Sequence, residues 1–213
     1  MNLPTGVTKI EGFVADPEAL FERLMADTVW DESMTARKTA SFGVPYNFTH
    51  INYPAVELPS ALEVMSEDTE RELGTLFNNC LMNLYADGSG SMGFHSDDTS
   101  CLQPGTGVAI VSLGFERIFT FRRKDDSSIE VSVGLPSGSL LYMDGGVQAE
   151  WLHGIRKMDD AGPRISLTWR AFVEQRRGHR ARHVDRVQPR AARRVRESCP
   201  VNGWSRHRQN GAA

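Results

Sequence analysis

The stretch Arg164-Ile-Ser-Leu-Thr-Trp-Arg170 does more than any other to define the fold, because polar and apolar side chains alternate along it. Successive side chains of a β-strand point to opposite faces. The two arginines, the serine and the threonine therefore share one face, and the three apolar side chains share the other. A strand with this pattern is expected to lie between an apolar layer and a polar pocket.

Six segments upstream of this stretch also have the texture of short strands. They are rich in β-branched and aromatic residues, and Gly, Pro, Asp and Ser separate them. Together the expected strands are 80–85, 108–113, 117–124, 129–133, 139–143, 151–157 and 164–173. Short strands in this number, with turn signals between them, favour a sandwich or jelly roll over alternating β-α-β units.

Two helices are expected ahead of these strands. Asp16-Pro17-Glu18 combines an N-cap, a proline in the first turn and an acid near the positive end of the helix dipole, and predicts a helix to about Asp27. A second helix opens at Leu58-Pro59-Ser60. Its apolar stripe passes a weak point at Gly74 and consists of Leu62, Met65, Leu73, Leu76 and Phe77. The two helices would cover one face of a sheet.

His95, Asp97, His153 and Arg164 have the spacing of one kind of site: His-x-Asp, a second histidine 56 residues after the aspartate, and an arginine 11 residues later. Two imidazoles and one carboxylate form the facial triad of non-heme Fe(II) oxygenases. The arginine offers a planar, bidentate cation for a dicarboxylate co-substrate. Each part alone is a weak signal, and packed or capping histidines are the alternative. The combined order predicts an Fe(II)- and 2-oxoglutarate-dependent dioxygenase.

Over residues 79–173 a longer series of motifs occurs in the order that is usual in the AlkB family, which this chain resembles. The motifs are Asn83-Leu-Tyr85, Asp87-Gly88, His95-Ser-Asp97-Asp98, Val111-Ser-Leu-Gly114, Arg117-Ile-Phe-Thr-Phe-Arg122, Gly138-Ser-Leu-Leu-Tyr-Met143, Gly145, Gln148, His153-Gly154 and Arg164-Ile-Ser-Leu-Thr-Trp-Arg170. The resemblance implies a mostly β (α+β) fold, a double-stranded β-helix or jelly roll with the N-terminal helices packed on one face. It also implies that Fe(II), 2-oxoglutarate and O2 are used to oxidise N-alkyl groups on DNA or RNA bases.

The resemblance further implies roles for individual residues. His95, Asp97 and His153 are expected to hold the iron and to be the catalytic residues. Arg164 is expected to bind the distal carboxylate of 2-oxoglutarate. Further co-substrate contacts are expected from Asn83, Tyr85, Ser166 and Arg170. For Arg170, a surface salt bridge is the alternative.

Substrate contacts are expected in two places. Tyr46 and Phe48 lie where the family has a nucleotide-recognition lid, and aromatic side chains stack on a base taken out of its helix. Alternatively, these aromatic residues pack against an edge of the core. Asp98 follows the iron motif directly. Thr99 stands where many repair members have an acid, and Ser166 where the family often has Asn, so base recognition and one co-substrate hydrogen bond are expected to differ.

Oxidative dealkylation of N-alkylated bases in DNA or RNA is the function that these features favour. Hydroxylation of an N-methyl group leads to release of formaldehyde and the free base. An AlkB-like hydroxylase of tRNA or of a small molecule is the alternative, motivated by Thr99 and Ser166. A non-enzymatic β-barrel binding module is disfavoured by the intact order of the motifs.

Charge is distributed unevenly along the chain. Residues 1–173 carry 13 Lys and Arg against 24 Asp and Glu, whereas residues 174–213 carry 11 Arg, no Lys and 3 acids. We expect N-terminal helices and a lid in 1–78, a catalytic core in 79–173 and a disordered Arg-rich tail in 174–213. The tail either holds nucleic acid by counterion release or is a solvated extension without a role.

The expected location is cytoplasmic. No stretch approaches the ~20 apolar residues of a membrane helix, and the first residues contain no apolar signal-peptide core. The three cysteines are widely spaced and form no Cys-x-x-Cys pair. We expect a monomer that binds alkylated DNA or RNA, as a single strand or a flipped base, and no membrane.

Removal of residues 174–213 is predicted to leave the β core folded, because the tail has too few apolar residues to belong to it. Iron-dependent turnover of 2-oxoglutarate by the truncated protein is expected to match that of the full chain, since every expected ligand precedes Glu174. If the arginines hold nucleic acid, truncation also weakens oligonucleotide binding and flattens its salt dependence. Aggregation or loss of turnover on truncation would contradict the assigned boundary.

Overall fold

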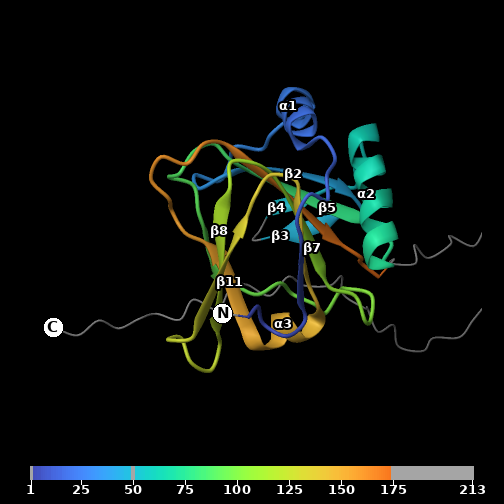
Figure 1. The fold of residues 1–213 in the computed structure, drawn as a ribbon. Coiled ribbons are helices and arrows are strands. Elements are labelled where there is room, and N and C mark those ends of the chain that lie inside the picture. Colours follow the sequence, from blue (N-terminus) through green and yellow to red (C-terminus); the bar gives the residue numbers. More distant parts are fainter. Residues whose placement is uncertain (1, 49–50, 174–213) are drawn as a thin grey trace, which may run out of the picture.

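The computed structural model describes residues 2–48 and 51–173, apart from the side chains of residues 47–52 (Figure 1). The expected Arg-rich tail, 174–213, lies outside the described residues. Two antiparallel sheets face each other, and helices lie outside them (Figure 1). The prediction of a mostly β jelly roll with N-terminal helices is confirmed.

The larger sheet has six strands and the smaller has four. In spatial order the larger sheet contains β1 (Val7–Ile10), β10 (Ser139–Met143), β7 (Val108–Gly114), β12 (Arg164–Arg170), β5 (Asn79–Tyr85) and β2 (Lys38–Gly43). The smaller sheet contains β6 (Met92–His95), β11 (Trp151–Ile155), β8 (Arg117–Arg123) and β9 (Glu130–Leu135). A separate hairpin pairs β3 (Tyr46–Phe48) with β4 (Ile51–Tyr53).

Strand β12 lies between β7 and β5. The apolar and polar side chains that alternate along it face opposite sides of the larger sheet. Ile165, Leu167 and Trp169 are fully buried in the cluster beneath α1 (Pro17–Asp27) and α2 (Ser60–Leu73). In Figure 1 both helices lie on the side of the larger sheet that faces away from β8 and β11. The arginines of β12 point to the opposite side, into the space between the sheets.

A second apolar cluster closes the space between the sheets. It contains Val108 and Ile110 of β7 together with Phe119 and Phe121 of β8. The short helix α3 (Gly145–Glu150) joins β10 to β11 at one end of this cluster and buries Val147 against it. Among the described residues, no helix is long and apolar enough to cross a membrane.

The expected helices are present, with one difference. Helix α1 begins as predicted, and the Asp16 side chain accepts a hydrogen bond from the Ala19 amide at 3.1 Å. Helix α2 ends at Leu73, because Gly74 adopts a left-handed conformation with φ of 66° that terminates the helix. The expectation that the apolar stripe of this helix includes Leu76 and Phe77 is therefore wrong. Leu76 is 61% exposed, and Phe77 is buried beyond the helix end.

The N-terminal part also supplies strands that the sequence pattern did not predict. Strands β1 and β2 form the two edges of the larger sheet, and β2 pairs with β5 along its whole length. Strand β1 has four residues, and Lys38-Thr-Ala-Ser-Phe-Gly43 contains few strong strand formers. Both strands lie at sheet edges, where hydrogen bonding to the neighbouring strand outweighs the weak strand propensity of their own residues.

Candidate metal and co-substrate site

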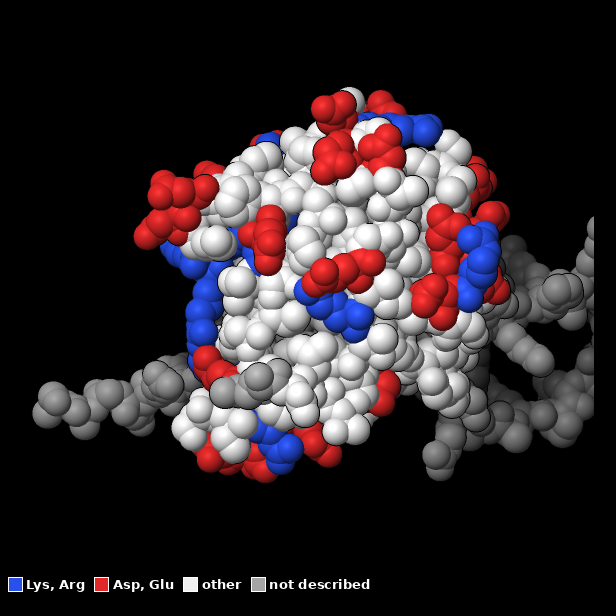
Figure 2. Space-filling view, in the orientation of Figure 1, with Lys and Arg blue, Asp and Glu red and all other residues white. Residues whose placement is uncertain are grey.

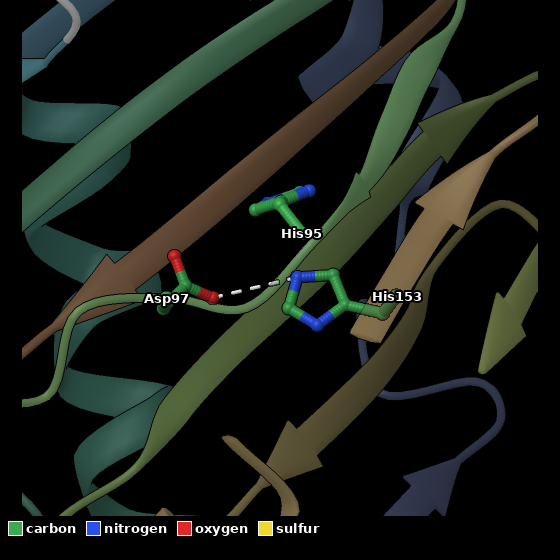
Figure 3. Close-up of side chains that lie close together, drawn as sticks. All are labelled: His95, Asp97 and His153. Carbon is green, nitrogen blue, oxygen red and sulfur yellow. Dashed lines mark ion pairs between the residues drawn. The ribbon is translucent and has the colours of Figure 1, made fainter. Parts of the chain in front are cut away.

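The three expected iron ligands converge between the sheets. Strands β6 and β11 pair antiparallel with His95 directly opposite His153, and Asp97 follows two residues after the end of β6. Their side chains point toward one another (Figure 3), with one ligand atom of each residue within 4.8 Å of the others. His153 Nε2 lies 3.5 Å from Asp97 Oδ2. Atoms that share one metal at ~2.1 Å lie roughly 3–4 Å apart, so the cluster can close on one ion with small side-chain adjustments.

Each of these side chains is held by a neighbour. His95 Nδ1 lies 2.8 Å from the Gly93 carbonyl oxygen, so that with a proton on Nδ1 the Nε2 lone pair is directed to the metal position. The His153 imidazole stacks on Phe119, with ring centroids 5.2 Å apart and planes 18° from parallel.

Asp97 is held at its backbone. The buried Gln148 of α3 accepts a hydrogen bond from the Asp97 amide at 2.8 Å through its Oε1. Gln148 thus fixes the main chain directly beneath the carboxylate.

The protonation states suit a metal. Burial and the neighbouring His95 lower the pKa of His153 to about 3, which leaves a neutral imidazole. Burial alone would raise the pKa of the Asp97 carboxyl, but Arg170 and the two imidazoles hold it well below its ordinary value. Two neutral imidazoles and one carboxylate are the ligand set of a facial-triad Fe(II) site, so the residues fit the metal.

Arg170 contacts the third ligand directly. Its Nη2 donates to Asp97 Oδ1, and its Cζ lies 5.0 Å above the centre of the Tyr46 ring. Only 5% of Arg170 is exposed, so the alternative of a surface salt bridge is wrong. The structure places this expected co-substrate contact against the carboxylate of a metal ligand.

A buried cation, Arg164, lies in the same space between the sheets as the His-Asp-His cluster. Arg164 is fully buried, and its Nε donates to Ser112 Oγ at 2.9 Å. Its two Nη atoms have no hydrogen-bond partner among the described residues. Burial lowers the pKa of Arg164 to about 10, and the side chain still carries its charge at neutral pH. A buried fork of unpaired donors fits the carboxylate of a co-substrate.

One cavity connects the two ends. It is lined by the expected metal ligands and by Asn83, Tyr85, Arg164, Ser166 and Arg170, so the structure brings all expected co-substrate residues together. Two further polar residues line the cavity: the alternation along β12 predicted Thr168 on its polar face, whereas Arg37 was not among the expected site residues. Thr168 lines the cavity beside Ser166, and Arg37 enters from the segment before β2 and donates to Asn83 Oδ1 at 2.8 Å. The sequence places Arg37 next to a lysine, which gave no signal of a buried contact.

The expected substrate residues are less closely grouped. Tyr46 stacks on Phe172 at a centroid distance of 5.4 Å and borders the site through Arg170. The Phe48 side chain lies outside the described residues. Asp98 is exposed, and its carboxylate accepts a hydrogen bond from the Ser100 amide at 2.8 Å. Of the three, the structure places only Tyr46 beside the cavity.

Gln148→Met is predicted to lower iron affinity roughly 10- to 100-fold, as loss of a partner that orients a ligand does in other metal sites. The methionine removes the acceptor for the Asp97 amide and keeps the side chain's length. Gln148→Glu keeps an oxygen acceptor and is the matched control. Titration of the oxygen-free protein with Fe(II) measures both. Equal affinities in the two variants would show that this hydrogen bond does not position Asp97.

Comparisons with known proteins agree with this geometry. The model of the 2OG-Fe(II) oxygenase superfamily matches residues 20–170. The alpha-ketoglutarate-dependent dioxygenases alkB homolog 3 of Bos taurus and Homo sapiens are each 32% identical over 200 residues, which cover 82% of this chain and 70% of theirs. The DNA oxidative demethylase ALKBH2 of Homo sapiens is 34% identical over 149 residues, or 64% of this chain and 57% of that protein.

Solved structures show the same fold at lower identity. OsALKBH1 superposes with a TM-score of 0.61 at 18% identity, over 80% of this chain and 100% of that one. A Pseudomonas putida prolyl-4-hydroxylase superposes with a TM-score of 0.51 at 18% identity, over 79% and 94%. The family match covers every strand of the two sheets except β1, and all three residues of the cluster. The chain therefore belongs to the AlkB family of Fe(II)- and 2-oxoglutarate-dependent dioxygenases.

Proposed function

We propose that this dioxygenase removes alkyl groups oxidatively from N-alkylated nucleobases in DNA or RNA. The observation that carries the proposal is the shared cavity, in which a His-Asp-His cluster faces a buried arginine with unpaired donors. Relatives named alkB homolog 3 and DNA oxidative demethylase ALKBH2 support the nucleic-acid substrate.

His95, Asp97 and His153 would hold the iron in this proposal. When bound, the iron supplies the oxidative chemistry that couples decarboxylation of 2-oxoglutarate to hydroxylation of the alkyl group. The protein contributes ligand geometry and exclusion of water. Arg170 binds Oδ1 of Asp97 and His153 lies closest to Oδ2, so the carboxylate is oriented before metal binds.

Arg164 would receive the distal carboxylate of 2-oxoglutarate with its two Nη groups, while Ser112 holds its Nε. Asn83 and Tyr85 of β5 and Ser166 of β12 form the walls of the same space. Because the charge is buried in the free protein, a carboxylate that pairs with it removes an unfavourable desolvated cation. This arrangement favours a co-substrate with a negative charge at its far end.

The stacked rings of Tyr46 and Phe172 would form the wall that a target base meets. Tyr46 is part of the β3–β4 hairpin, which is tied to the larger sheet by a 2.6 Å hydrogen bond between Tyr53 and Thr39. A fixed aromatic wall beside a metal centre is suited to a base that has left its helical stack.

The alternative, a hydroxylase of tRNA or of a small molecule, is favoured by one feature. Thr99 is exposed and outside the cavity lining, at a position where a difference in base recognition is expected from the sequence. Substrate identity therefore has to be measured.

The decisive experiment supplies Fe(II), 2-oxoglutarate and O2 with single-stranded DNA, RNA or tRNA that contains N-methylated bases. We expect formaldehyde and the unmethylated base in equal amounts from DNA or RNA oligonucleotides. His95→Ala and Asp97→Ala are expected to abolish turnover with the fold retained, because both remove a ligand and leave the core packing intact. Succinate release without formaldehyde from any methylated nucleic acid would reject the dealkylase and favour the alternative.

Arg164→Lys is predicted to raise the dissociation constant of 2-oxoglutarate strongly while iron affinity stays unchanged. Lysine keeps the charge but lacks the planar fork that pairs with both carboxylate oxygens. Arg170→Lys is the comparison variant, and it is expected to weaken iron binding because Arg170 contacts Asp97. Titration of each oxygen-free apoprotein with Fe(II), followed by calorimetric titration of the metal-loaded protein with 2-oxoglutarate, separates the two effects. Small, equal effects would show that neither arginine acts as assigned.

A further inference from the structure

Arg117, at the start of β8, is a second fully buried guanidinium near the co-substrate end of the cavity. It does not line the cavity itself. All of its described hydrogen bonds go to backbone carbonyls. Nη1 donates to Asp87 at 3.2 Å, and Nη2 donates to Gly90 at 2.9 Å and to Arg156 at 2.7 Å.

These three carbonyls belong to the segments from which the site residues extend. The Asp87–Gly90 turn connects β5, which ends at Tyr85, to β6, which ends at His95. Arg156 directly follows β11, the strand of His153. One guanidinium therefore joins the main chain near a cavity wall to the main chain near two expected metal ligands.

In the described part of the chain, Arg117 also has no carboxylate bonded directly to it. Among the described residues it forms no ion pair with a carboxylate, and its Nε has no hydrogen-bond partner. The Asp87 carboxylate, whose backbone it contacts, is instead bonded to Ser89. Carbonyl groups solvate the guanidinium without cancelling its charge, and the nearby Asp87 carboxylate is exposed and offsets that charge only in part.

Tyr85 stands next to both buried cations. Its ring centre lies 5.7 Å from Arg117 Cζ and 5.5 Å from Arg164 Cζ. Burial and, to a smaller extent, the positive charge of Arg117 lower the pKa of Arg164. An anion bound by Arg164 is thus attracted by a second cation that it does not touch.

We propose that Arg117 is a positioning and specificity-determining residue, which makes the co-substrate end of the cavity selective for a distal carboxylate by adding a second buried positive charge and by fixing the turn next to Tyr85. The inference rests on the proposed placement of 2-oxoglutarate against Arg164. If Arg117 had only a structural role, its substitution would weaken the binding of all cavity ligands equally. A charge that acts on the distal carboxylate affects only ligands that have one.

Two ligands of equal chain length separate these roles. 2-Oxoglutarate has the distal carboxylate, and 2-oxopentanoate has a methyl group in its place. Their dissociation constants are measured by calorimetry on the oxygen-free Fe(II) protein. Arg117→Gln keeps amide donors for the carbonyls but removes the charge, whereas Arg117→Lys keeps the charge. Arg122→Gln is the control, because Arg122 lies on the same strand and pairs with Glu130.

Arg117→Gln is expected to weaken binding of 2-oxoglutarate about tenfold or more, the order expected for a unit charge acting through a partly buried medium. Binding of 2-oxopentanoate stays within about twofold of wild type. Arg117→Lys retains most of the preference, and Arg122→Gln retains all of it. Equal weakening of both ligands, or no change in either, overturns the proposal. If Arg117→Gln does not fold, a Lys variant that loses the preference overturns it, and one that keeps it supports the charge as the cause.

Arg164→Gln distinguishes this inference from the proposed site. If that variant binds 2-oxoglutarate as the wild type does, the placement of the co-substrate is wrong, and the role of Arg117 is wrong with it. If Arg164→Gln loses the preference for 2-oxoglutarate and Arg117→Gln keeps it, only the inference about Arg117 is wrong.

Discussion

The Arg164 guanidinium is fully buried, and its one hydrogen bond among the described residues joins Nε to Ser112. A charge taken out of water costs several kcal/mol unless a partner compensates for it. Favourable interactions in the surrounding fold offset this cost. Strand β12 is bonded on both sides along its length, and its other face packs Ile165, Leu167 and Trp169 beneath the helices. The apolar face thereby holds the polar face in place.

Strand register is consequently the feature that builds the site. A slip of one residue along β12 would turn the arginines into the apolar layer and Ile165 into the cavity. The same holds in the smaller sheet, where His95 faces His153 across β6 and β11. The core strands cannot slip without exchanging apolar for charged side chains, so the energy that stabilises the core also fixes the distance between ligands.

Periodicity predicted those parts of the protein in which local pattern and burial agree. The two faces of β12 and the start of α1 at Asp16 are of this kind. Pattern did not reveal the contact of Arg170 with Asp97, because these residues are 73 positions apart and meet only through folding. Nor did it reveal β1 and β2, whose pairing depends on β10 and β5 already being in place. The contact of Arg37 was missed for the same reason, because its partner Asn83 lies on another strand.

The two ends of the cavity are built from different kinds of structure. The end proposed for the metal and co-substrate is formed by strands whose side chains are buried, among them Asn83, His153 and Arg164. The proposed substrate end borders the β3–β4 hairpin and the loop after Asp97, in which Asp98 and Thr99 are exposed. An exposed loop residue can be replaced without disturbing the core, whereas the replacement of a buried ligand disturbs its surroundings. Thr99, which is expected from the sequence to alter base recognition, is such an exposed position, and the His-Asp-His cluster does not depend on it.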